Sequence, residues 1–554
     1  MIDNIKITFN DSTTEEFSKG ITVQEVADFY QTKMINPIIG ATINNQVVEM
    51  NTKLNSDTVL TFFDINDING HKIYQAGLKF VMTVALKDLY PTNGRVVFGH
   101  SIDKGIMCEI SNGKPLDEEM CEKLKEKMNE IITSNLPIEK LRVSKKEAIN
   151  YYNSIGENEK AINIQNSSTI YVTLYKLKNS YNYFYTDMPS NTGVLSKFDL
   201  IFLKEGEAVL MFPSPRSANE VPNYKHNEKV VEAFDVAKEW VRTIDVEYVS
   251  HFNKIVTERK ISEFIRMNEL FFSNSIYDMV KDALTNENLK MILIAGPSSS
   301  GKTTSTKRIK SYLKSMGKKV LMISVDDYFK DRGDTPKKDN GEYDFESVLA
   351  IEVDLFNSHL EKLINGEGVK LPTYDFIAGK KYYPNEAVTI DSDTLLVVEG
   401  LHCLNEKLTE QIPRISKYKV YLSPFAPLNA DRHNHLSTLD LRLIRRIVRD
   451  NRDRGRAVTE TIKSWQSVRY GEEEYIFPHI GEADSVLNTA LIYELGVLKV
   501  YAEPILYSVD INSPYYEEAR RLISFLSSFF PISSEYVPRD SILREFIGGS
   551  IYEK

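Results

Sequence analysis

A glycine- and serine-rich loop between an apolar strand and a helix is the feature that most constrains this chain. The loop GPSSSGKT, Gly296 to Thr303, follows the strand-like KMILIA and precedes TSTKRIKSYLKSMG, an amphipathic helical segment. This order fits the GxxxxGK[ST] pattern, in which glycines let backbone N–H groups turn inward around an anion. The Lys302 ammonium is expected to reach phosphates and the Thr303 hydroxyl to ligate Mg²⁺. The sequence therefore predicts a parallel α/β domain with a phosphate site at the start of a helix.

Carboxylates end two further strands of this predicted sheet. Asp326 and Asp327 follow KKVLMIS, and Glu399 lies near the end of DTLLVVEG. Ligands of open parallel sheets bind beyond the carboxyl ends of the strands. One of the aspartates is therefore placed to accept the proton of an acceptor hydroxyl, and Glu399 to hold Mg²⁺ directly or through water. A GTPase is disfavoured, because neither NKxD nor DxxG follows the loop.

Length and composition predict several folded domains. At about 150 residues per domain, a chain of 554 residues with 42% hydrophobic and 26% charged residues is expected to form more than one globular unit. The net charge of −10 argues against nonspecific nucleic-acid binding by the whole chain. Three scattered cysteines, no basic leader and no long apolar run lead us to expect a cytoplasmic protein without a membrane span.

Changes of texture along the chain predict four regions. Residues 1–65 alternate short strands with one helix and predict a small α+β domain. Residues 66–215 mix helices and strands up to the Pro-rich PSPRSANEVP, and residues 216–287 are mostly helical and predict a connector. Residues 288–554 contain the phosphate loop and predict the parallel α/β domain, with helices on both faces of the sheet.

A basic segment follows the predicted sheet. Residues 431–470 contain ten Lys or Arg residues against five Asp or Glu, and DLRLIRRIVRDNRDRGRAV has a helical period with a break at its glycine. The arginines of interest are Arg442, Arg446 and Arg449 on one face, and Arg454 and Arg456 beside the glycine. We interpret the segment as a mobile lid that brings arginines to a transferring phosphoryl group. The alternatives are a solvated basic face and direct RNA binding, although interleaved aromatic residues for stacking are missing.

Six ordered motifs give residues 288–500 a resemblance to the uridine/cytidine kinase and phosphoribulokinase group of P-loop kinases. They are GPSSSGKT, SVDDYF, YDFESVLAIEVDLF, LPTYDF, VVEG and RLIRRIVRDNRDRGR. The resemblance implies Asp326 as the base that orients a nucleoside 5'-hydroxyl, Lys302 and Arg449 as further catalytic residues, and metal ligation by Thr303, Glu399 and Asp326. The implied ATP contacts are Gly296, Pro297, Ser298, Ser299, Ser300, Gly301, Lys302, Thr303, Thr304, Arg454 and Arg456.

The implied substrate contacts depart from those of pyrimidine nucleoside kinases. Asp344, Tyr374, Phe376 and Arg446 occupy the family's substrate positions. However, the family's histidine, glutamine and tyrosine positions hold Gly379, Ser464 and Phe329. Since a pocket discriminates strongly only through polar groups that a wrong ligand leaves unpaired, we expect a nucleoside substrate with the base left open.

The N-terminal half has its own resemblance, over residues 1–215. The first 65 residues resemble a TGS domain, a β-grasp module of threonyl-tRNA synthetases and some GTPases, and the following part resembles the synthetase's second, editing-type domain. The positions of that domain's metal ligands hold Ala76, Phe80, Phe184 and Met188, none of which is a zinc ligand. We therefore expect no zinc and no editing hydrolysis, and interpret this half as a binding, regulatory or assembly module.

The leading hypothesis is a Mg²⁺-dependent kinase that transfers the γ-phosphoryl group of ATP to the 5'-hydroxyl of a nucleoside. One alternative is a kinase of another small alcohol, such as a sugar phosphate or a pantothenate-like acid. Another is a nucleotide-gated RNA-binding or translation-associated regulator, which the synthetase-like half motivates. The predicted partners are ATP and a nucleoside, with RNA or a regulatory ligand at the N-terminal half, and a homo-oligomer is also expected.

Overall fold

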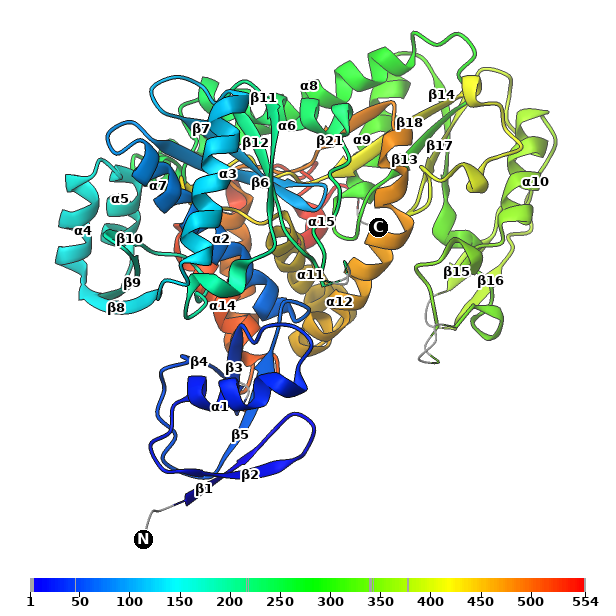
Figure 1. Ribbon diagram of the computed structural model, residues 1–554. Coiled ribbons are helices and arrows are strands. Elements are labelled where there is room, and N and C mark those ends of the chain that lie inside the picture. The colour runs from blue at the N-terminus through cyan, green and yellow to red at the C-terminus, as the bar shows by residue number, and fades with distance from the viewer. Residues whose placement is uncertain are drawn as a thin grey trace.

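A small N-terminal unit projects from the larger body of the molecule (Figure 1). The computed structural model describes residues 4–44, 46–215, 217, 219–337, 341, 343–375 and 378–552. Figure 1 shows this unit below the rest of the molecule, with the phosphate-loop sheet at the opposite side from the synthetase-like helices. The strands of the N-terminal unit pair in the order β2-β1-β5-β3-β4. The bounds are β1 Asn4–Thr8, β2 Thr14–Ser18, α1 Val23–Tyr30, β3 Gly40–Ile43, β4 Gln46–Val48 and β5 Thr58–Phe63. This mixed sheet with one helix agrees with the predicted small α+β domain.

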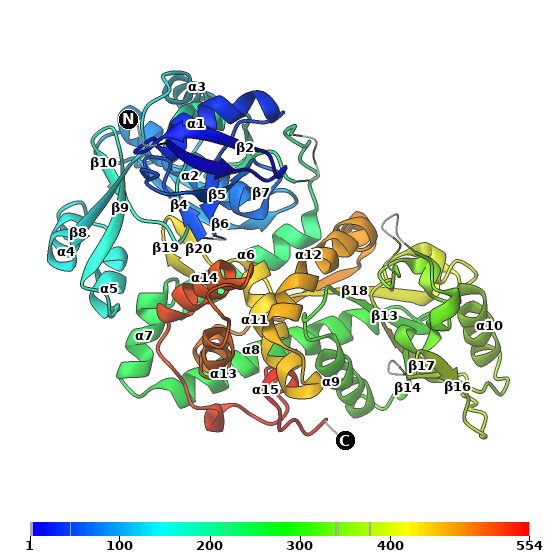
Figure 2. The ribbon, with the colours of Figure 1, turned by 90° about the horizontal axis from the view of Figure 1, so that it is seen from below.

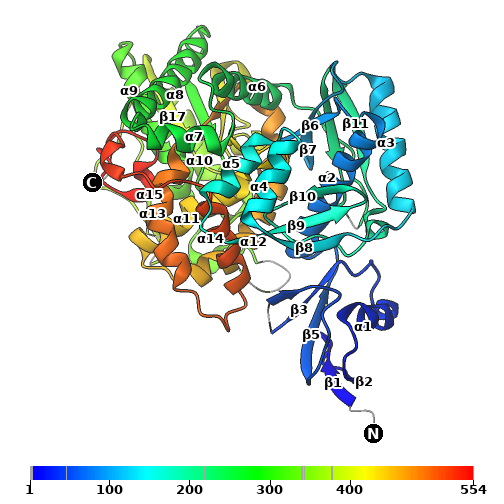
Figure 3. The same ribbon diagram turned by 90° about the vertical axis from the view of Figure 1, so that its left-hand side faces the viewer.

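The second part of the chain packs two long helices on an antiparallel sheet. The sheet order is β11-β12-β7-β6, and a separate sheet, β10-β9-β8, lies beside two shorter helices (Figure 3). The elements are α2 Ile68–Leu89, β6 Arg95–Ile102, β7 Gly105–Ser111, α3 Glu118–Thr133, β8 Glu139–Ser144, α4 Lys145–Ser154, α5 Asn158–Asn166, β9 Tyr171–Leu177, β10 Ser180–Asn182, β11 Asp199–Lys204 and β12 Glu207–Met211. Most residues of α2 are buried, and the helix packs beside α3 on this sheet.

The third part is helical and leads into a fully parallel sheet. The connecting helices are α6 Glu228–Thr243, α7 Val249–Thr257 and α8 Ile261–Ala283, and the sheet order is β14-β17-β13-β18-β21. The sheet and its surrounding elements are β13 Met291–Ala295, α9 Lys302–Ser315, β14 Lys319–Ser324, α10 Val353–Ile364, β15 Thr373–Asp375, β16 Lys380–Tyr382, β17 Thr394–Glu399, β18 Lys417–Ser423, β19 Asn429–Asp431, β20 Asn434–His435, α11 Thr438–Arg454, α12 Val458–Tyr475 and β21 Ser485–Asn488.

Both faces of this parallel sheet are covered. Along β13, Met291 and Leu293 contribute to one hydrophobic core, whereas Ile292 and Ile294 contribute to another. A strand buried on both faces needs a continuous apolar run, which is what MILIA supplies. The α/β prediction for this half is thus confirmed. The last helices are α13 Glu494–Tyr507, α14 Tyr516–Ser527 and α15 Arg544–Ile547; α13 and α15 pack against α11, and α14 packs against α13.

The β19–β20 hairpin of the kinase-like half inserts into the second part of the chain. Fully buried Lys160 has its ammonium 3.5 Å from the carboxylate of Asp431, and the Tyr183 hydroxyl donates to the same carboxylate at 2.8 Å. The Phe98 N–H also donates to the carbonyl of Arg432 at 2.9 Å. Since buried charges are tolerated only when they are paired, this contact fixes one arrangement of the two halves.

A second contact between the halves is a chain of ion pairs. Lys72 of α2 lies 2.9 Å from Glu518 of α14, which lies 2.8 Å from Arg521. Arg521 donates to both carboxylate oxygens of Asp440 in the first turn of α11, at 2.7 and 2.6 Å. The four side chains are between 15% and 25% exposed, so solvent screens them only in part. The start of the arginine helix is therefore tied to the synthetase-like helix α2.

We expect Arg521→Met to destabilise the protein, because it leaves Glu518 and Asp440 without their shared cation. Breaking a fully buried pair costs about 3 to 5 kcal/mol, and partial exposure reduces our expectation here to about 2 kcal/mol. Thermal and urea unfolding would measure the loss. Arg520→Met is the matched control, since Arg520 is the neighbouring arginine on α14 and stacks on Tyr507 and Tyr516. Equal stability of the two variants would contradict the role given to this network.

Candidate active site

Three neighbouring strands bring the phosphate loop and the predicted acidic residues to one edge of the sheet. Glu399 ends β17 and pairs in register with Ile294 of β13 on one side and Ser324 of β14 on the other. The loop follows β13 directly, and Asp326 lies two residues beyond the end of β14 in a single 3-10 turn. The sequence predicted only that the phosphate loop and the carboxylates follow strands of one sheet. The register of β13, β14 and β17 shows that they lie at the same edge.

The loop has the backbone shape of an anion cradle. Ser299 and Gly301 adopt left-handed conformations, with φ of 59° and 85°. Left-handed residues within a turn make successive N–H groups converge, which is the geometry that binds phosphate. Gly296 has no room for a side chain, because a Cβ there would lie 2.4 Å from the carbonyl oxygen of Leu422. Lys302 donates across the loop to the carbonyls of Gly296 and Pro297, at 2.8 and 3.2 Å.

Buried side chains bind the loop's carbonyls from behind. Arg442 donates to the carbonyl of Ser298 at 2.9 Å, and Arg445 to that of Ser299 at 3.3 Å. The Thr489 hydroxyl donates to the carbonyl of Ser300 at 2.6 Å. With these carbonyls held on the protein side, the backbone of the loop is fixed in one conformation.

Two carboxylates neutralise these arginines. Glu472 pairs with Arg442 and also accepts the Ser298 N–H at 2.8 Å. Glu494 accepts from two nitrogens of Arg445, at 2.6 and 3.0 Å. All four side chains are at most 2% exposed. The pattern of arginines in the sequence pointed to α11, but nothing in the sequence distinguished those that support the loop from those that face a ligand.

The acidic residues at the sheet edge act on one another electrostatically. Burial raises the pKa of Glu399 to about 7; Asp326 adds to this shift and Lys302 opposes it. The Asp326 side chain is exposed, but nearby protein removes part of its hydration, and this desolvation raises its pKa; Lys302 opposes the shift and Asp327 adds to it. Lys302, Asp326 and Glu399 thus form one coupled group beside the loop.

The two neighbouring aspartates differ in what they contact. Asp327 accepts the backbone N–H of Tyr374 at 3.1 Å and so anchors β15. Tyr374 in turn donates its hydroxyl to the carbonyl of Lys330 at 3.3 Å. Asp327 therefore has a structural contact, and Asp326 is the better candidate for chemistry.

Aromatic rings lie close to the turn that carries Asp326, since Phe329 follows three residues further along and Tyr374 donates its N–H to Asp327. Phe329 lies 5.8 Å from Tyr374 and 6.2 Å from Phe345, and Phe345 lies 5.9 Å from Tyr343, ring centre to ring centre. We call these four residues the acceptor-side aromatic group. Such a group suits a planar ring, which gains from stacking without specific hydrogen bonds.

Other predicted substrate positions have varied surroundings. Asp344 accepts the hydroxyl of Tyr475 at 2.9 Å, and the Ser464 hydroxyl donates to its own helix at Thr461. At Gly379 an added Cβ would meet the side chain of Arg332 at 3.0 Å, so Arg332 fills the space beside this glycine. Phe376 lies outside the described residues.

The predicted arginines gather around one buried carboxylate. Asp450 lies 3.3 Å from Arg446, 3.7 Å from Arg449 and 3.3 Å from Arg454. Burial lowers the pKa of both Arg446 and Arg449, and neighbouring arginines add to the shift, whereas Asp450 and, at Arg449, also Glu545 oppose it. Arg446 also donates to the hydroxyl of Ser298 at 2.8 Å, which brings it to the loop. An added anion, such as a phosphate, would stabilise this group.

The arginine helix differs from the mobile lid that the sequence suggested. Leu441, Leu443, Ile444 and Ile447 of α11 are each at most 2% exposed and belong to the main core. Only its C-terminal turn leaves the core, where Arg454 is 57% exposed and Arg456 lies 3.6 Å from Glu460. The body of the helix is therefore a fixed wall of the loop, for a physical reason that periodicity does not reveal: both its apolar and its basic faces are packed.

The chemistry of the donor set fits Mg²⁺ and a nucleotide. The Thr303 side chain is exposed in the first turn of α9, and Asp326 and Glu399 supply the carboxylate oxygens that Mg²⁺ prefers. The hydroxyls of Ser299 and Ser300 are buried without a hydrogen-bond partner in the described part of the chain. These unsatisfied groups, together with the cradle, suit an anion bound to the loop.

In the synthetase-like part, aromatic and aliphatic packing occupies the positions of the metal ligands. Phe80 packs against Phe184 at 5.8 Å, and the buried ammonium of Lys79 lies 5.8 Å from the ring of Phe184. Ala76 is buried and Met188 packs on the same core. Among the described residues no group of three His, Cys, Asp or Glu side chains is arranged to hold a metal. The expectation that this part binds no zinc stays a prediction.

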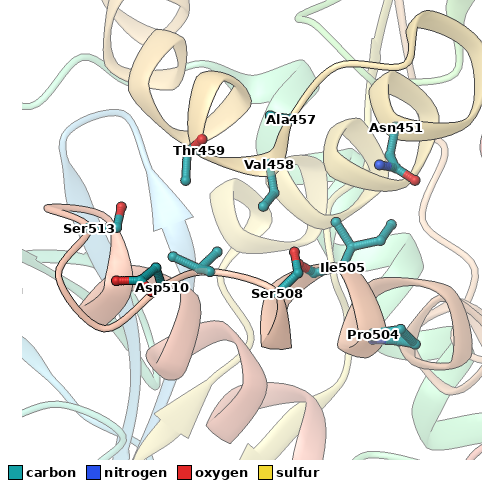
Figure 4. A pocket seen from close by; sticks show the side chains of 10 residues that line it. Asn451, Ala457, Val458, Thr459, Pro504, Ile505, Ser508, Asp510 and Ser513 are labelled. Carbon is teal, nitrogen blue, oxygen red and sulfur yellow. The ribbon is translucent and has the colours of Figure 1, made fainter.

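A hollow of about 560 Å³ lies apart from these groups, between the start of α12 and the end of α13 (Figure 4). Apolar side chains such as Val458, Ile505 and Val509 line much of it, and Asp510 is its charged residue. No lysine or arginine is among the described residues that line it. It is therefore unsuited to phosphates, and the loop edge remains the candidate active site.

Within the described residues no helix combines the length and apolar character needed to cross a membrane.

The parallel sheet, the phosphate cradle and the adjacent carboxylates define a P-loop kinase fold. The sequence model of the Phosphoribulokinase / Uridine kinase family matches residues 291–492, and that of the TGS domain matches residues 5–64. A uridine kinase of Anoxybacillus flavithermus is 30% identical over 198 residues, which cover 36% of this chain and 84% of the relative, and one of Bacillus pumilus is 32% identical with 85% covered. The chain belongs to the phosphoribulokinase/uridine kinase family, a family of ATP-dependent kinases.

The N-terminal half matches a different class of protein. A threonine–tRNA ligase of Caldanaerobacter subterraneus is 34% identical over 145 residues, which are 26% of this chain. The chain spans only 22% of the length of that ligase.

Among solved structures, one described as a possible uridine kinase from Bacillus stearothermophilus aligns at 19% identity and a TM-score of 0.27, covering 39% of this chain and 98% of that one. The two family models and the sequence relatives confirm the predicted resemblances of both halves.

We expect Arg445→Met to lower stability and weaken ADP binding together. The change leaves Glu494 buried without its cation, which costs about 3 to 5 kcal/mol, and releases the carbonyl of Ser299. Unfolding curves and calorimetric titration with ADP would measure both effects. Arg539→Met, at an exposed arginine, is the control. Full ADP affinity in a destabilised Arg445→Met would show that the loop keeps its shape without this support.

Proposed function

We propose that the protein is a nucleoside kinase that transfers the γ-phosphoryl group of ATP to the 5'-hydroxyl of its acceptor. The observation that carries this proposal is the position of Asp326 at the sheet edge, near both the phosphate loop and the acceptor-side aromatic group. A carboxylate there is within electrostatic reach of Lys302 and next to rings that suit a nucleobase. The uridine kinase relatives support the same class of acceptor.

In the proposed mechanism, Asp326 accepts the proton of the 5'-hydroxyl as its oxygen attacks the γ-phosphorus. The bond between that phosphorus and the bridging oxygen breaks, and ADP leaves. Lys302 and the loop N–H groups hold the phosphates, while Arg446 and Arg449 offset the negative charge of the transferring group. Thr303 and Glu399, with Asp326 nearby, would hold Mg²⁺, which neutralises phosphate charge when bound.

We leave the base open, since Gly379, Ser464 and Phe329 offer none of the polar side chains that the pyrimidine kinases carry at these positions. The competing acceptors are sugar phosphates and pantothenate-like acids. Measuring ATP consumption with purified protein over nucleosides, sugar phosphates and pantothenate separates them. Turnover with a nucleoside and none with the other two classes supports the proposal, and the reverse result overturns it.

For the N-terminal half we propose a binding role, with RNA as the first candidate ligand. The TGS domain and the match to a tRNA ligase favour it. Titration of tRNA with the full-length protein at several salt concentrations tests this role, because phosphate contacts give affinity a steep salt dependence. An absence of binding at low salt would contradict it.

Asp326→Asn should lower kcat by about 10² to 10⁴, the usual contribution of a general base. The amide keeps the size of the side chain but cannot take up the proton. ADP affinity should stay close to that of the wild type, since the loop is intact. Asp327→Asn serves as the comparison, because Asp327 contacts backbone and not the proposed acceptor. Unchanged turnover of Asp326→Asn with the preferred substrate would refute the assignment.

The rate should fall as the pH is lowered towards the pKa of Asp326. Desolvation by the surrounding protein raises this pKa above the usual value of about 4, and only the ionised carboxylate can accept the proton. Activity is therefore present above that pKa and lost below it. A profile of kcat/KM against pH measures the position of this acidic limb. A rate that stays flat down to a pH of about 4 would contradict a base with a raised pKa.

A further inference from the structure

The C-terminal extension of the chain crosses the start of the phosphate-binding helix. The family match ends at residue 492, so α15 and its flanking segment lie outside it. Figures 2 and 3 both place α15 beside α9 and α11, close to the end of the chain. Ile542 packs directly on the loop, where a Cβ at Gly301 would lie 2.7 Å from its Cγ2.

Glu545 of this segment lies on the N-terminal turn of α9. One of its carboxylate oxygens accepts the backbone N–H of Thr304 at 3.1 Å, and the other lies 3.9 Å from a guanidinium nitrogen of Arg449. The Glu545 side chain is only 15% exposed. The carboxylate is thus an anion held by a helix N-terminus and an arginine, which is how proteins bind phosphate.

Other contacts hold this segment in place. The Arg544 guanidinium donates to the carbonyls of Ser534 and Val537, at 2.7 Å each. The Tyr493 hydroxyl lies 3.2 Å from the hydroxyl of Ser541, and Lys307 of α9 donates to the carbonyl of Tyr552 at 2.9 Å. Glu545 is therefore positioned by a braced strap and does not reach the loop by chance rotation of a surface side chain.

The same two groups, the Thr304 N–H and Arg449, are in the set proposed to bind the nucleotide. A carboxylate and a phosphate cannot share one N–H donor, and two anions at this distance repel each other. We propose that Glu545 is an internal substitute for a nucleotide phosphate, which ADP or ATP must displace to bind. This inference rests on the proposed nucleotide site at the loop. Displacement also frees Arg449 from Glu545, so that binding and release of this arginine are coupled.

Calorimetric titration of the full-length protein with ADP tests the proposal. Glu545→Gln removes the charge and keeps the shape, and it should tighten ADP binding by about tenfold, the amount expected from removing one competing charge at a helix terminus. Glu545→Ala should do the same and is measured in any case, so that a folding defect in one variant does not decide the result. The matched control is Glu535→Gln, an exposed glutamate of the same extension, which should leave affinity unchanged.

Equal or weaker ADP binding in the folded Glu545 variants overturns the internal-substitute proposal but leaves the nucleotide site standing. If neither wild type nor variants bind ADP or ATP, the proposed function itself fails, and the inference fails with it. Titration with inorganic phosphate separates the two sources of anion. Tightening for ADP with or without tightening for phosphate supports the proposal, and tightening for neither contradicts it.

Discussion

The buried pairing of arginines with glutamates behind the phosphate loop is the interaction on which the rest of the active site depends. Arg442 and Arg445 bind loop carbonyls from the protein side, and Glu472 and Glu494 make their burial tolerable. A loop with left-handed residues is strained unless its surroundings fix it. Held in this way, the loop directs its N–H groups outward, and the ends of β14 and β17 then place Asp326 and Glu399 around the same space.

Much of this arrangement could be predicted from the sequence, because its signals are local. The GPSSSGKT loop, the apolar strand before it and the carboxylates that follow two strands specify a parallel sheet with its site at one edge. The TGS and synthetase resemblances rest on ordered residues in the same way. In contrast, the hairpin of β6 and β7 and the helices α4, α5 and α7 were not predicted, since they are short or owe their stability to packing that the sequence does not display.

The site shows the same limit. Nothing in the spacing of the arginines separates Arg442, which is buried against Glu472, from Arg446, which reaches a loop hydroxyl. The partners Glu472, Glu494 and Glu545 are 30 to 96 positions from the arginines they contact, so pairing could be found only in three dimensions. The ion-pair chain from Lys72 to Asp440 likewise connects the two halves, and its first pair, Lys72 with Glu518, joins residues more than 400 positions apart. It gives the N-terminal half a physical connection to the arginine helix.

The proposed reaction is transfer of a phosphoryl group to a nucleoside 5'-hydroxyl. It is tested most directly by incubating the protein with ATP and Mg²⁺ and either a nucleoside that it accepts or the matching 5'-deoxynucleoside, and following products by ³¹P NMR. We expect a nucleoside 5'-monophosphate and ADP in the first case, and neither product above background in the second. Equal ATP consumption with the 5'-deoxynucleoside, or phosphate attached at another hydroxyl, would contradict it.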